Sequence, residues 1–242
     1  MSWVESVKTR YSELRLQELA KNPRRYLAEK LSRLKNAPAL RRLIHGRRVL
    51  VLGSGPSAGE LDSIPKDVLI LTCNNGVKLL SEKHFNRAID LYYCTATKIG
   101  KKDIMGALQK VKTDIFITTN PGQIADHAAF AGSYRRLMSY DNMHKNFARR
   151  LYWAKKYRFK NRKTVSAGVR LLQYALYFGA YEIFIIGIDL ETSGYFWGGK
   201  NRQKHAGVDA NFIQAAQKTH GAIYSLSPKS PLARLLPHKD FV

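Results

Sequence analysis

Apolar side chains follow two different spacings along this chain, and the spacing changes near residue 47. Before that point they recur every three or four positions, which is typical of amphipathic helices. They form two stripes, interrupted at Asn22-Pro23, made of Trp3, Val7, Tyr11, Leu14, Leu16 and Leu19, then Tyr26, Leu27, Leu31, Leu34 and Leu40. The pattern predicts a basic, amphipathic helical arm over residues 1–46, with eleven Lys and Arg against four Glu.

From residue 47 onward, short apolar runs alternate with segments of helical spacing. The runs predict strands at residues 49–52, 68–73, 88–94, 114–118, 182–188 and 222–226. Alternation of this kind predicts an α/β fold, a Rossmann-like and mostly parallel sheet with helices on both faces, over residues 47–242. Ligands of such sheets bind beyond the carboxyl ends of the strands, so the residues directly after each run are the candidates for ligand contacts.

Charge and composition narrow the class of partner. The chain has 242 residues, with 41 Lys and Arg against 18 Asp and Glu, a net charge of +23. Such a charge predicts a polyanionic partner: nucleic acid, an anionic membrane or a phosphorylated substrate. No apolar stretch approaches the about 20 residues that a membrane span needs. The two cysteines, Cys73 and Cys94, lie in strand-like runs, and we expect buried, reduced thiols in a cytosolic protein that is soluble or membrane-peripheral.

Two basic segments have more than one interpretation. The arm can pack on the main domain, or lie on an anionic membrane or a partner. Residues 145–163 contain nine Lys and Arg, no acid and five aromatic residues at helical spacing. Three interpretations fit this pattern. The segment is a helix with buried rings and solvated cations, a surface for an anionic acceptor or membrane, or a nucleic-acid site that stacks bases on the rings.

A glycine-rich turn, GSGPS at residues 53–57, follows the first predicted strand. Turns of this kind present backbone amides to a phosphate or a ribose. We therefore expect the turn to bind a nucleotide through Gly53, Ser54, Gly55 and Ser57.

The nucleotide is not expected to be NAD. Ala58 stands where the dinucleotide fingerprint has its third glycine, and the second strand ends in Asn74 where an acidic residue would hold the ribose. An amide suits a base edge, a sugar or a phosphate, so Asn74 joins the predicted site. No Gly-Lys-Ser/Thr follows the turn, which excludes a Walker phosphate loop.

A second group of polar residues lies near the end of the chain. Small residues at a helix start, Ser166, Ala167 and Gly168, let a ligand approach the free amides. Asp189 follows the strand at 182–188 and faces the ligand edge, or else caps the following turn. A lid-like loop then leads to His205, which is either a general base or a solvated surface histidine.

Taken together, these motifs carry a resemblance. The motifs are GSGPS, CNN at 73–75, SAGV at 166–169, YEIFIIGIDL, a later His and IYSLSPKSPLARLLP. In their order along the chain they resemble the bacterial sialyltransferases of glycosyltransferase family 42. They are more distantly similar to lipopolysaccharide-core transferases that use 3-deoxy-manno-octulosonic acid (Kdo), and to the Rossmann domains of pterin pyrophosphokinases. The resemblance covers about residues 48–237 and implies inverting transfer of a nonulosonic acid, of sialic acid or Kdo type, from a CMP-sugar without a metal or other cofactor.

The resemblance also implies residue roles. Tyr195 would hydrogen-bond the leaving phosphate, and His205 would take the proton of the acceptor hydroxyl. The cytidine would meet the backbones of Ala167 and Gly168. The chain departs from the family pattern at Cys94, where the family has asparagine, at Ala167, where it has serine, and at Glu191, where it has a phosphate-binding tyrosine.

Glu191 leaves two alternatives for the leaving phosphate. In the first, the Glu191 carboxylate is neutralised by Lys200, Arg202 and Lys204. In the second, a divalent cation is held by Asp189 and Glu191. The expected acceptor is an anionic glycolipid or glycan such as lipopolysaccharide core, at the inner face of the bacterial inner membrane. The rival classes are a nucleic-acid-binding protein on a Rossmann-like scaffold and a pterin pyrophosphokinase-like enzyme.

Overall fold

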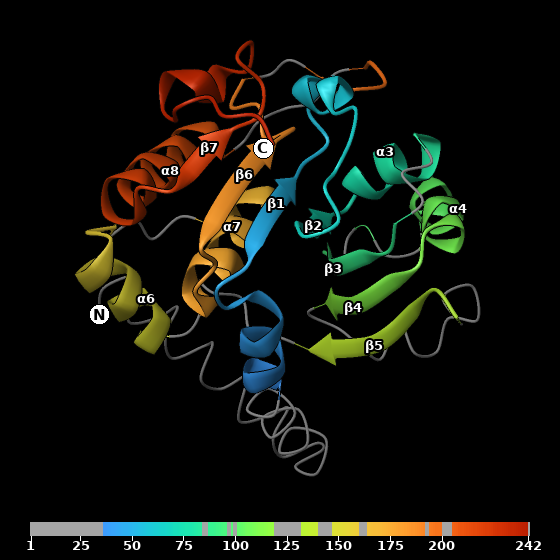
Figure 1. Cartoon of the computed structure of the whole chain (residues 1–242), viewed down its shortest axis with the longest axis horizontal. Coiled ribbons are helices and arrows are strands. Elements are labelled where there is room, and N and C mark those ends of the chain that lie inside the picture. The colour runs from blue at the N-terminus through green and yellow to red at the C-terminus, as the bar shows by residue number, and fades with distance from the viewer. Residues whose placement is uncertain are drawn as a thin grey trace, which may run out of the picture.

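The structure is a computed structural model that describes residues 36–83, 87–95, 98, 101–118, 132–139, 147–159, 164–191, 194–199 and 205–241. Within these residues seven parallel strands form one sheet, and Figure 1 shows them in the order β5-β4-β3-β2-β1-β6-β7. The strands are β1 Arg48–Leu52, β2 Leu69–Cys73, β3 Ile89–Cys94, β4 Thr113–Thr118, β5 Tyr134–Ser139, β6 Glu182–Ile186 and β7 Ile223–Ser225. All six predicted strands are present, and β5 is an additional one.

The order of the strands reverses beside β1. The chain moves outward from β1 through β2, β3 and β4 to the edge strand β5, and then returns to place β6 against the other side of β1. Both neighbours pair with β1 in parallel, Val51 opposite Leu71 on one side and Ile185 on the other. In open α/β sheets the crevice at such a reversal, outside the carboxyl ends of the strands, is the usual ligand site.

Helices cover both faces of the sheet. Alternate residues of β1 enter two separate cores: Val49 and Val51 face the layer of α6, α7 and α8, whereas Leu50 and Leu52 face α3, α4 and the 3-10 helix η1. The helices are α3 Gly76–Glu82, α4 Lys102–Lys110, α6 Phe147–Lys156, α7 Ala167–Phe178 and α8 Ala206–His220, with η1 Pro56–Glu60 and η4 Pro231–Arg234. Because both faces are buried, strands of nearly continuous apolar residues are stable here, and the predicted α/β class is confirmed.

The described end of the predicted arm packs on the main domain. Residues 36–44 form a helix in which Leu40 and Ile44 are fully buried in the α7 side of the core. Residues 1–35, which hold both predicted stripes except Leu40, lie outside the described residues. The described part of the chain contains no helix that is long and apolar enough to span a membrane.

Helix α6 settles which way the aromatic rings of the basic segment point. Trp153, Tyr157 and Phe159 are 2%, 3% and 9% exposed, and all three pack around Phe212 of α8. Lysines 155 and 156 are exposed on the same helix. These rings therefore belong to the core and are not available to stack on the bases of a nucleic acid.

Candidate functional site

The loops after β1 and β6 approach each other very closely at the point where the strand order reverses. A Cβ atom on Gly53 would lie 2.0 Å from the carbonyl oxygen of Gly187, so only glycine fits at residue 53. Gly187 itself has a φ of +71°, a left-handed conformation that favours glycine. The Gly55 N–H donates to the Gly187 carbonyl at 2.8 Å. The GSGPS turn thus packs its backbone directly on the end of β6.

Asp189 and Ser57 join the same two loops through side chains. The Asp189 carboxylate accepts from the Ser57 N–H at 2.9 Å and from the Ser230 hydroxyl at 2.7 Å. The Ser57 hydroxyl accepts from the Gly187 N–H at 2.9 Å. Asp189 is 3% exposed, and its two oxygens cap η1 and hold the loop before η4. Within the described residues, the hydrogen-bond donors to the Asp189 carboxylate come from these two loops. None of these donors comes from the turn that follows Asp189.

A cavity of about 330 Å³ lies beyond these strand ends. Small-molecule sites occupy roughly 300–1,000 Å³. Nine of the eleven residues predicted for the site line this one cavity: Gly53, Ser54, Asn74, Ser166, Ala167, Gly168, Asp189, Tyr195 and His205. The other two, Gly55 and Ser57, lie behind the wall of the cavity, where they pack on Asp189. The structure therefore brings together residues that are up to 152 positions apart in the sequence.

Asn74 is held in a special backbone conformation at the end of β2. Its φ is 46°, a left-handed value that asparagine adopts more readily than most residues. Its side-chain oxygen accepts from the N–H of Thr95 at 3.1 Å and from the Thr95 hydroxyl at 3.2 Å. Its side-chain NH₂ has no acceptor among the described residues, so it is free to donate to a ligand in the cavity.

The start of α7 forms the opposite wall. Ser166 caps the helix, because its hydroxyl accepts from the Val169 N–H at 3.3 Å. Asp209 of α8 accepts from the Ser166 N–H at 2.9 Å and fixes the cap from behind. Burial raises the pKa of the Asp209 carboxyl. The next two amides, those of Ala167 and Gly168, belong to the first helical turn, where no intrahelical acceptor is in reach.

His205 and Tyr195 stand at the mouth of the cavity. His205 is the N-cap residue of α8, makes no side-chain capping bond, and lines the cavity. The Tyr195 ring stacks on Trp197 with the two centroids 4.4 Å apart and the planes 6° apart. The Phe196 N–H donates to the Ser54 carbonyl at 3.2 Å and ties this segment to the GSGPS turn.

Glu191 lies in a neighbouring cavity of about 540 Å³, on the other side of Asp189, and does not line the cavity described above. It pairs with Arg234 at 3.6 Å at the surface. The resemblance implies that this acid lies near the leaving phosphate, whereas Glu191 lines a different cavity from Tyr195 and His205. Lysines 200 and 204 and Arg202, the cations expected to neutralise it, lie outside the described residues.

Arg170 is among the residues of the site that sequence reasoning missed. It lies in the first turn of α7, lines the cavity and is only 6% exposed. Its Nη1 donates to the Tyr93 hydroxyl, and the guanidinium carbon lies 5.1 Å from the Tyr93 ring centroid. The signal was present as the lone charged residue inside a mostly apolar helical segment, VRLLQYALYF at 169–178.

The predicted buried thiols are confirmed. Cys73, which lines the same cavity, and Cys94 are both free and buried. Burial raises the pKa of each thiol to about 12. Both are therefore protonated near neutral pH, and neither is suited to act as a nucleophile.

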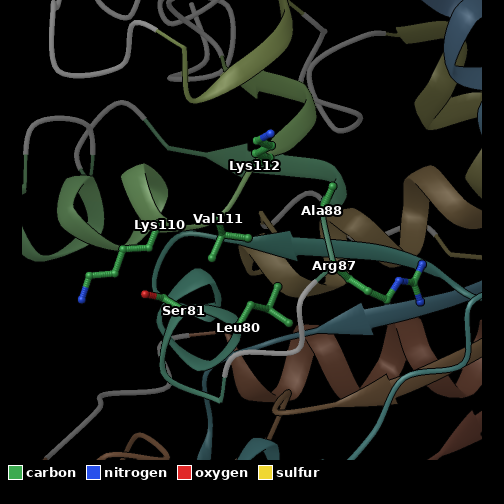
Figure 2. Close-up of a pocket in the computed structure, with 7 residues that line it drawn as sticks. All are labelled: Leu80, Ser81, Arg87, Ala88, Lys110, Val111 and Lys112. Carbon is green, nitrogen blue, oxygen red and sulfur yellow. The ribbon is translucent and has the colours of Figure 1, made fainter.

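A larger cavity, of about 590 Å³, lies at the opposite edge of the sheet (Figure 2). It is formed where α3 and α4 end, beside the residues that precede β3 and β4. Figure 2 shows the heads of Arg87 and Lys110 at opposite ends of the labelled group. The Arg87 guanidinium already donates to the carbonyls of Pro65 and Val68. Helix C-termini repel anions, so these cations do not form a converging anion site.

Comparison with known proteins identifies the fold. No protein-family model and no curated protein matches the chain. The sialyltransferase CstII from Campylobacter jejuni, in complex with the substrate analogue cytidine-5'-monophosphate, has a TM-score of 0.56 at 18% identity, over 82% of this chain and 89% of that chain. The sialyltransferase CST-II in complex with trisaccharide acceptor and CMP has a TM-score of 0.52 at 18% identity, over 81% and 89%. An alpha-2,3-sialyltransferase from Campylobacter jejuni in apo form has a TM-score of 0.51 at 14% identity, over 80% of each chain.

The fold is a Rossmann-like α/β fold with its cavity at the point of strand reversal. More particularly, it is the fold of the sialyltransferases of Campylobacter jejuni. The likeness in fold that the sequence motifs predicted is confirmed.

Proposed function

We propose that this chain is a glycosyltransferase that uses a CMP-activated sugar. The observation that carries the proposal is the convergence of nine predicted site residues on one cavity, in a fold shared with a sialyltransferase that binds CMP. The cavity offers small residues, amides, hydroxyls and a helix N-terminus, a set that suits a nucleoside with one phosphate held close.

In this proposal the cavity walls have separate tasks. Gly53, Ser54 and Asn74 receive the nucleotide at the ends of β1 and β2, and the amides of Ala167 and Gly168 meet the cytidine. Gly55, Ser57 and Asp189 support the nucleotide loop from behind. Tyr195 donates to the leaving phosphate. A neutral hydroxyl donor aimed at a developing charge stabilises a transition state without first binding tightly to the ground state.

His205 is the proposed general base. It would accept the proton of the acceptor hydroxyl as the anomeric carbon is attacked from the face opposite the phosphate, so that the configuration inverts. One bond forms between the acceptor oxygen and the anomeric carbon, the bond to the phosphate breaks, and CMP leaves with the bonding electrons. We expect no metal requirement, since protein groups serve both the proton and the phosphate.

For donor and acceptor we propose a nonulosonic acid, of sialic acid or Kdo type, and an anionic glycolipid or glycan such as lipopolysaccharide core. The net charge of +23 supports an anionic surface, which we place at the inner face of a bacterial inner membrane. Each basic residue near an anionic bilayer contributes roughly 1 kcal/mol of attraction.

A nucleotide panel tests the core of this proposal. Thermal shifts should be largest for CMP among CMP, CDP, UDP, GDP, AMP, NAD and ATP, since a ligand that binds only the folded state raises its stability. A response to NAD or ATP alone would refute the proposal and favour a dehydrogenase or a pterin pyrophosphokinase. Release of CMP from a CMP-sugar, dependent on an added glycan and insensitive to EDTA, then tests the transfer and its metal independence.

A further inference from the structure

Arg170 places a buried positive charge in the wall of the cavity. It is the fourth residue of α7 and is 6% exposed, and it faces Cys73 and Tyr93 at the ends of β2 and β3. Arginine is not deprotonated in proteins, so this buried side chain carries a positive charge. A charge removed from water is costly unless it is paired, so the partners of this group decide its role.

Those partners do not neutralise the charge. The guanidinium donates once, to the Tyr93 hydroxyl, while its Nε is buried and has no partner among the described residues. None of the ion pairs within the described residues includes Arg170. A guanidinium that lines the cavity therefore has one N–H without a partner, and no counter-charge, among the described residues.

The neighbouring acidic groups form no ion pair with Arg170 within the described part of the chain. Burial raises the pKa of the Cys73 thiol to about 12 and also raises the pKa of the Tyr93 hydroxyl, so both stay neutral at pH 7. Asp209 is within electrostatic range of Arg170, but it accepts from the Ser166 N–H and forms no ion pair with the guanidinium.

The start of α7 adds to the same positive field. Ala167 and Gly168 line the cavity from the same first turn of α7 as Arg170, at the positive end of the helix dipole. A helix N-terminus together with an unpaired, buried guanidinium favours an anion more strongly than either feature alone.

We propose that Arg170, in the positive field at the start of α7, forms an oxyanion receptor for the donor, which takes either its phosphate or the carboxylate of its sugar. The inference rests on the proposed function for the identity of the donor, whereas the receptor itself is defined by the unpaired guanidinium. Arg170 would contact the donor directly through its guanidinium. A planar guanidinium can bind either oxyanion in a bidentate manner, which a lysine cannot do.

Isothermal titration with three ligands tests the receptor and separates the two oxyanions. Cytidine carries neither anion, CMP carries the phosphate, and CMP-3-fluoro-N-acetylneuraminic acid carries the phosphate and the carboxylate. Each ligand is titrated into wild type, Arg170→Met and the control Arg48→Met. Arg48 pairs with Asp67 and Glu182 at the amino edge of the sheet and is remote from the cavity, so its loss should leave all three affinities unchanged.

Loss of a charge-assisted hydrogen bond in Arg170→Met should weaken the anionic ligand about 10- to 100-fold and leave cytidine unchanged. If Arg170→Met binds CMP more weakly than wild type does, Arg170 binds the phosphate. If its affinity for CMP is unchanged and its affinity for the fluoro-sugar analogue falls, Arg170 binds the carboxylate. Equal losses for all three ligands, or no loss for any, would overturn the receptor. If Arg170→Met does not fold, Arg170→Lys is compared in the same way, with a smaller loss expected.

The failure of the proposed function has a different signature. If wild type binds none of the three ligands, the CMP-sugar proposal is refuted, and the receptor is then judged with inorganic phosphate alone. Wild type should bind phosphate more tightly than Arg170→Met. Equal binding would overturn the receptor as well.

Discussion

Ser57 and Asp189 hold each other's loops in place, although 132 positions separate them. The Asp189 carboxylate accepts from the Ser57 N–H at 2.9 Å, and the Ser57 hydroxyl accepts from the N–H of Gly187, next but one to Asp189, also at 2.9 Å. The two bonds run in opposite directions between the loop after β1 and the loop after β6. They fix the spacing of the two loops at the cavity, so both residues are positioning residues for the site.

Asp189→Ala should therefore reduce the stability of the whole domain. It leaves the Ser57 N–H and the Ser230 hydroxyl unpaired in the interior, and we expect a loss of about 2–4 kcal/mol in the free energy of unfolding. Urea denaturation measures this loss. The control is Asp62→Ala, whose side chain is 94% exposed and whose loss should stay within about 0.5 kcal/mol. An Asp189→Ala protein of normal stability would show that this network is dispensable.

Gly53→Ala should be severely destabilising, because the new Cβ would lie 2.0 Å from the Gly187 carbonyl oxygen. We expect a loss of about 3–5 kcal/mol or failure to fold. Gly106→Ala is the matched control, since its Cβ meets nothing within 4 Å inside α4. Alanine is the better helix former, so this control should gain about 0.5–1 kcal/mol. Equal stability of the two variants would contradict the close packing of the loops.

The strands with two buried faces could be predicted from the sequence, because such strands are continuous apolar runs. β5 could not be predicted in this way. It is one of the two edge strands of the sheet, it reads YRRLMS, and Arg135 and Arg136 are exposed. An edge strand needs few apolar residues, and charges on it prevent pairing with another chain. The apolar pattern that identifies a central strand is therefore missing.

Part of the candidate site could also be predicted from the sequence. Parallel strands bring their carboxyl ends to one edge, so residues directly after predicted strands converge, as Gly53, Asn74 and Asp189 do. Arg170 lies within a helix, and only the packing of α7 across β2 and β3 turns it toward the cavity. The buried support role of Ser57 likewise depends on a contact made 130 positions away, which no local pattern encodes.

Trp197 should matter for ligand binding and little for stability. It is 39% exposed, stacks on Tyr195 and carries the Lys78 ammonium 4.4 Å from its ring centroid. Trp197→Ala removes the stacking partner of Tyr195, so CMP affinity should fall about 3- to 10-fold while the melting temperature changes little. Trp197→Phe should restore most of the affinity.

Tyr181→Ala is the control for Trp197. Tyr181 is 70% exposed and lies just before β6, at the sheet edge opposite the cavity. Its loss should leave CMP affinity unchanged in calorimetric titration. If Trp197→Ala also binds CMP as wild type does, the stack with Tyr195 plays no part in positioning the ligand.

Two truncations separate the contribution of the arm to folding from its contribution to surface binding. Removal of residues 1–46 deletes Leu40 and Ile44, which are both fully buried. The loss of each side chain should lower the free energy of unfolding by about 1.5–3 kcal/mol. Removal of residues 1–35 keeps both side chains and should leave a folded domain that binds CMP normally. Co-sedimentation with anionic vesicles should be weaker for the shorter deletion than for the full chain. Unchanged sedimentation would contradict a membrane role for the arm.

His205→Ala should lower turnover about 10²- to 10⁴-fold and leave CMP affinity nearly unchanged. The reason is that a general base acts on the acceptor proton in the transition state, and CMP carries no acceptor. Steady-state release of CMP gives the turnover, and calorimetric titration gives the affinity. His220→Gln is the matched control, because His220 ends the same helix α8 that His205 begins and lies remote from the cavity. Added imidazole should restore part of the turnover of His205→Ala and none of any loss in His220→Gln. Near-normal turnover of His205→Ala would assign the proton transfer to another group and leave His205 as the N-cap residue of α8.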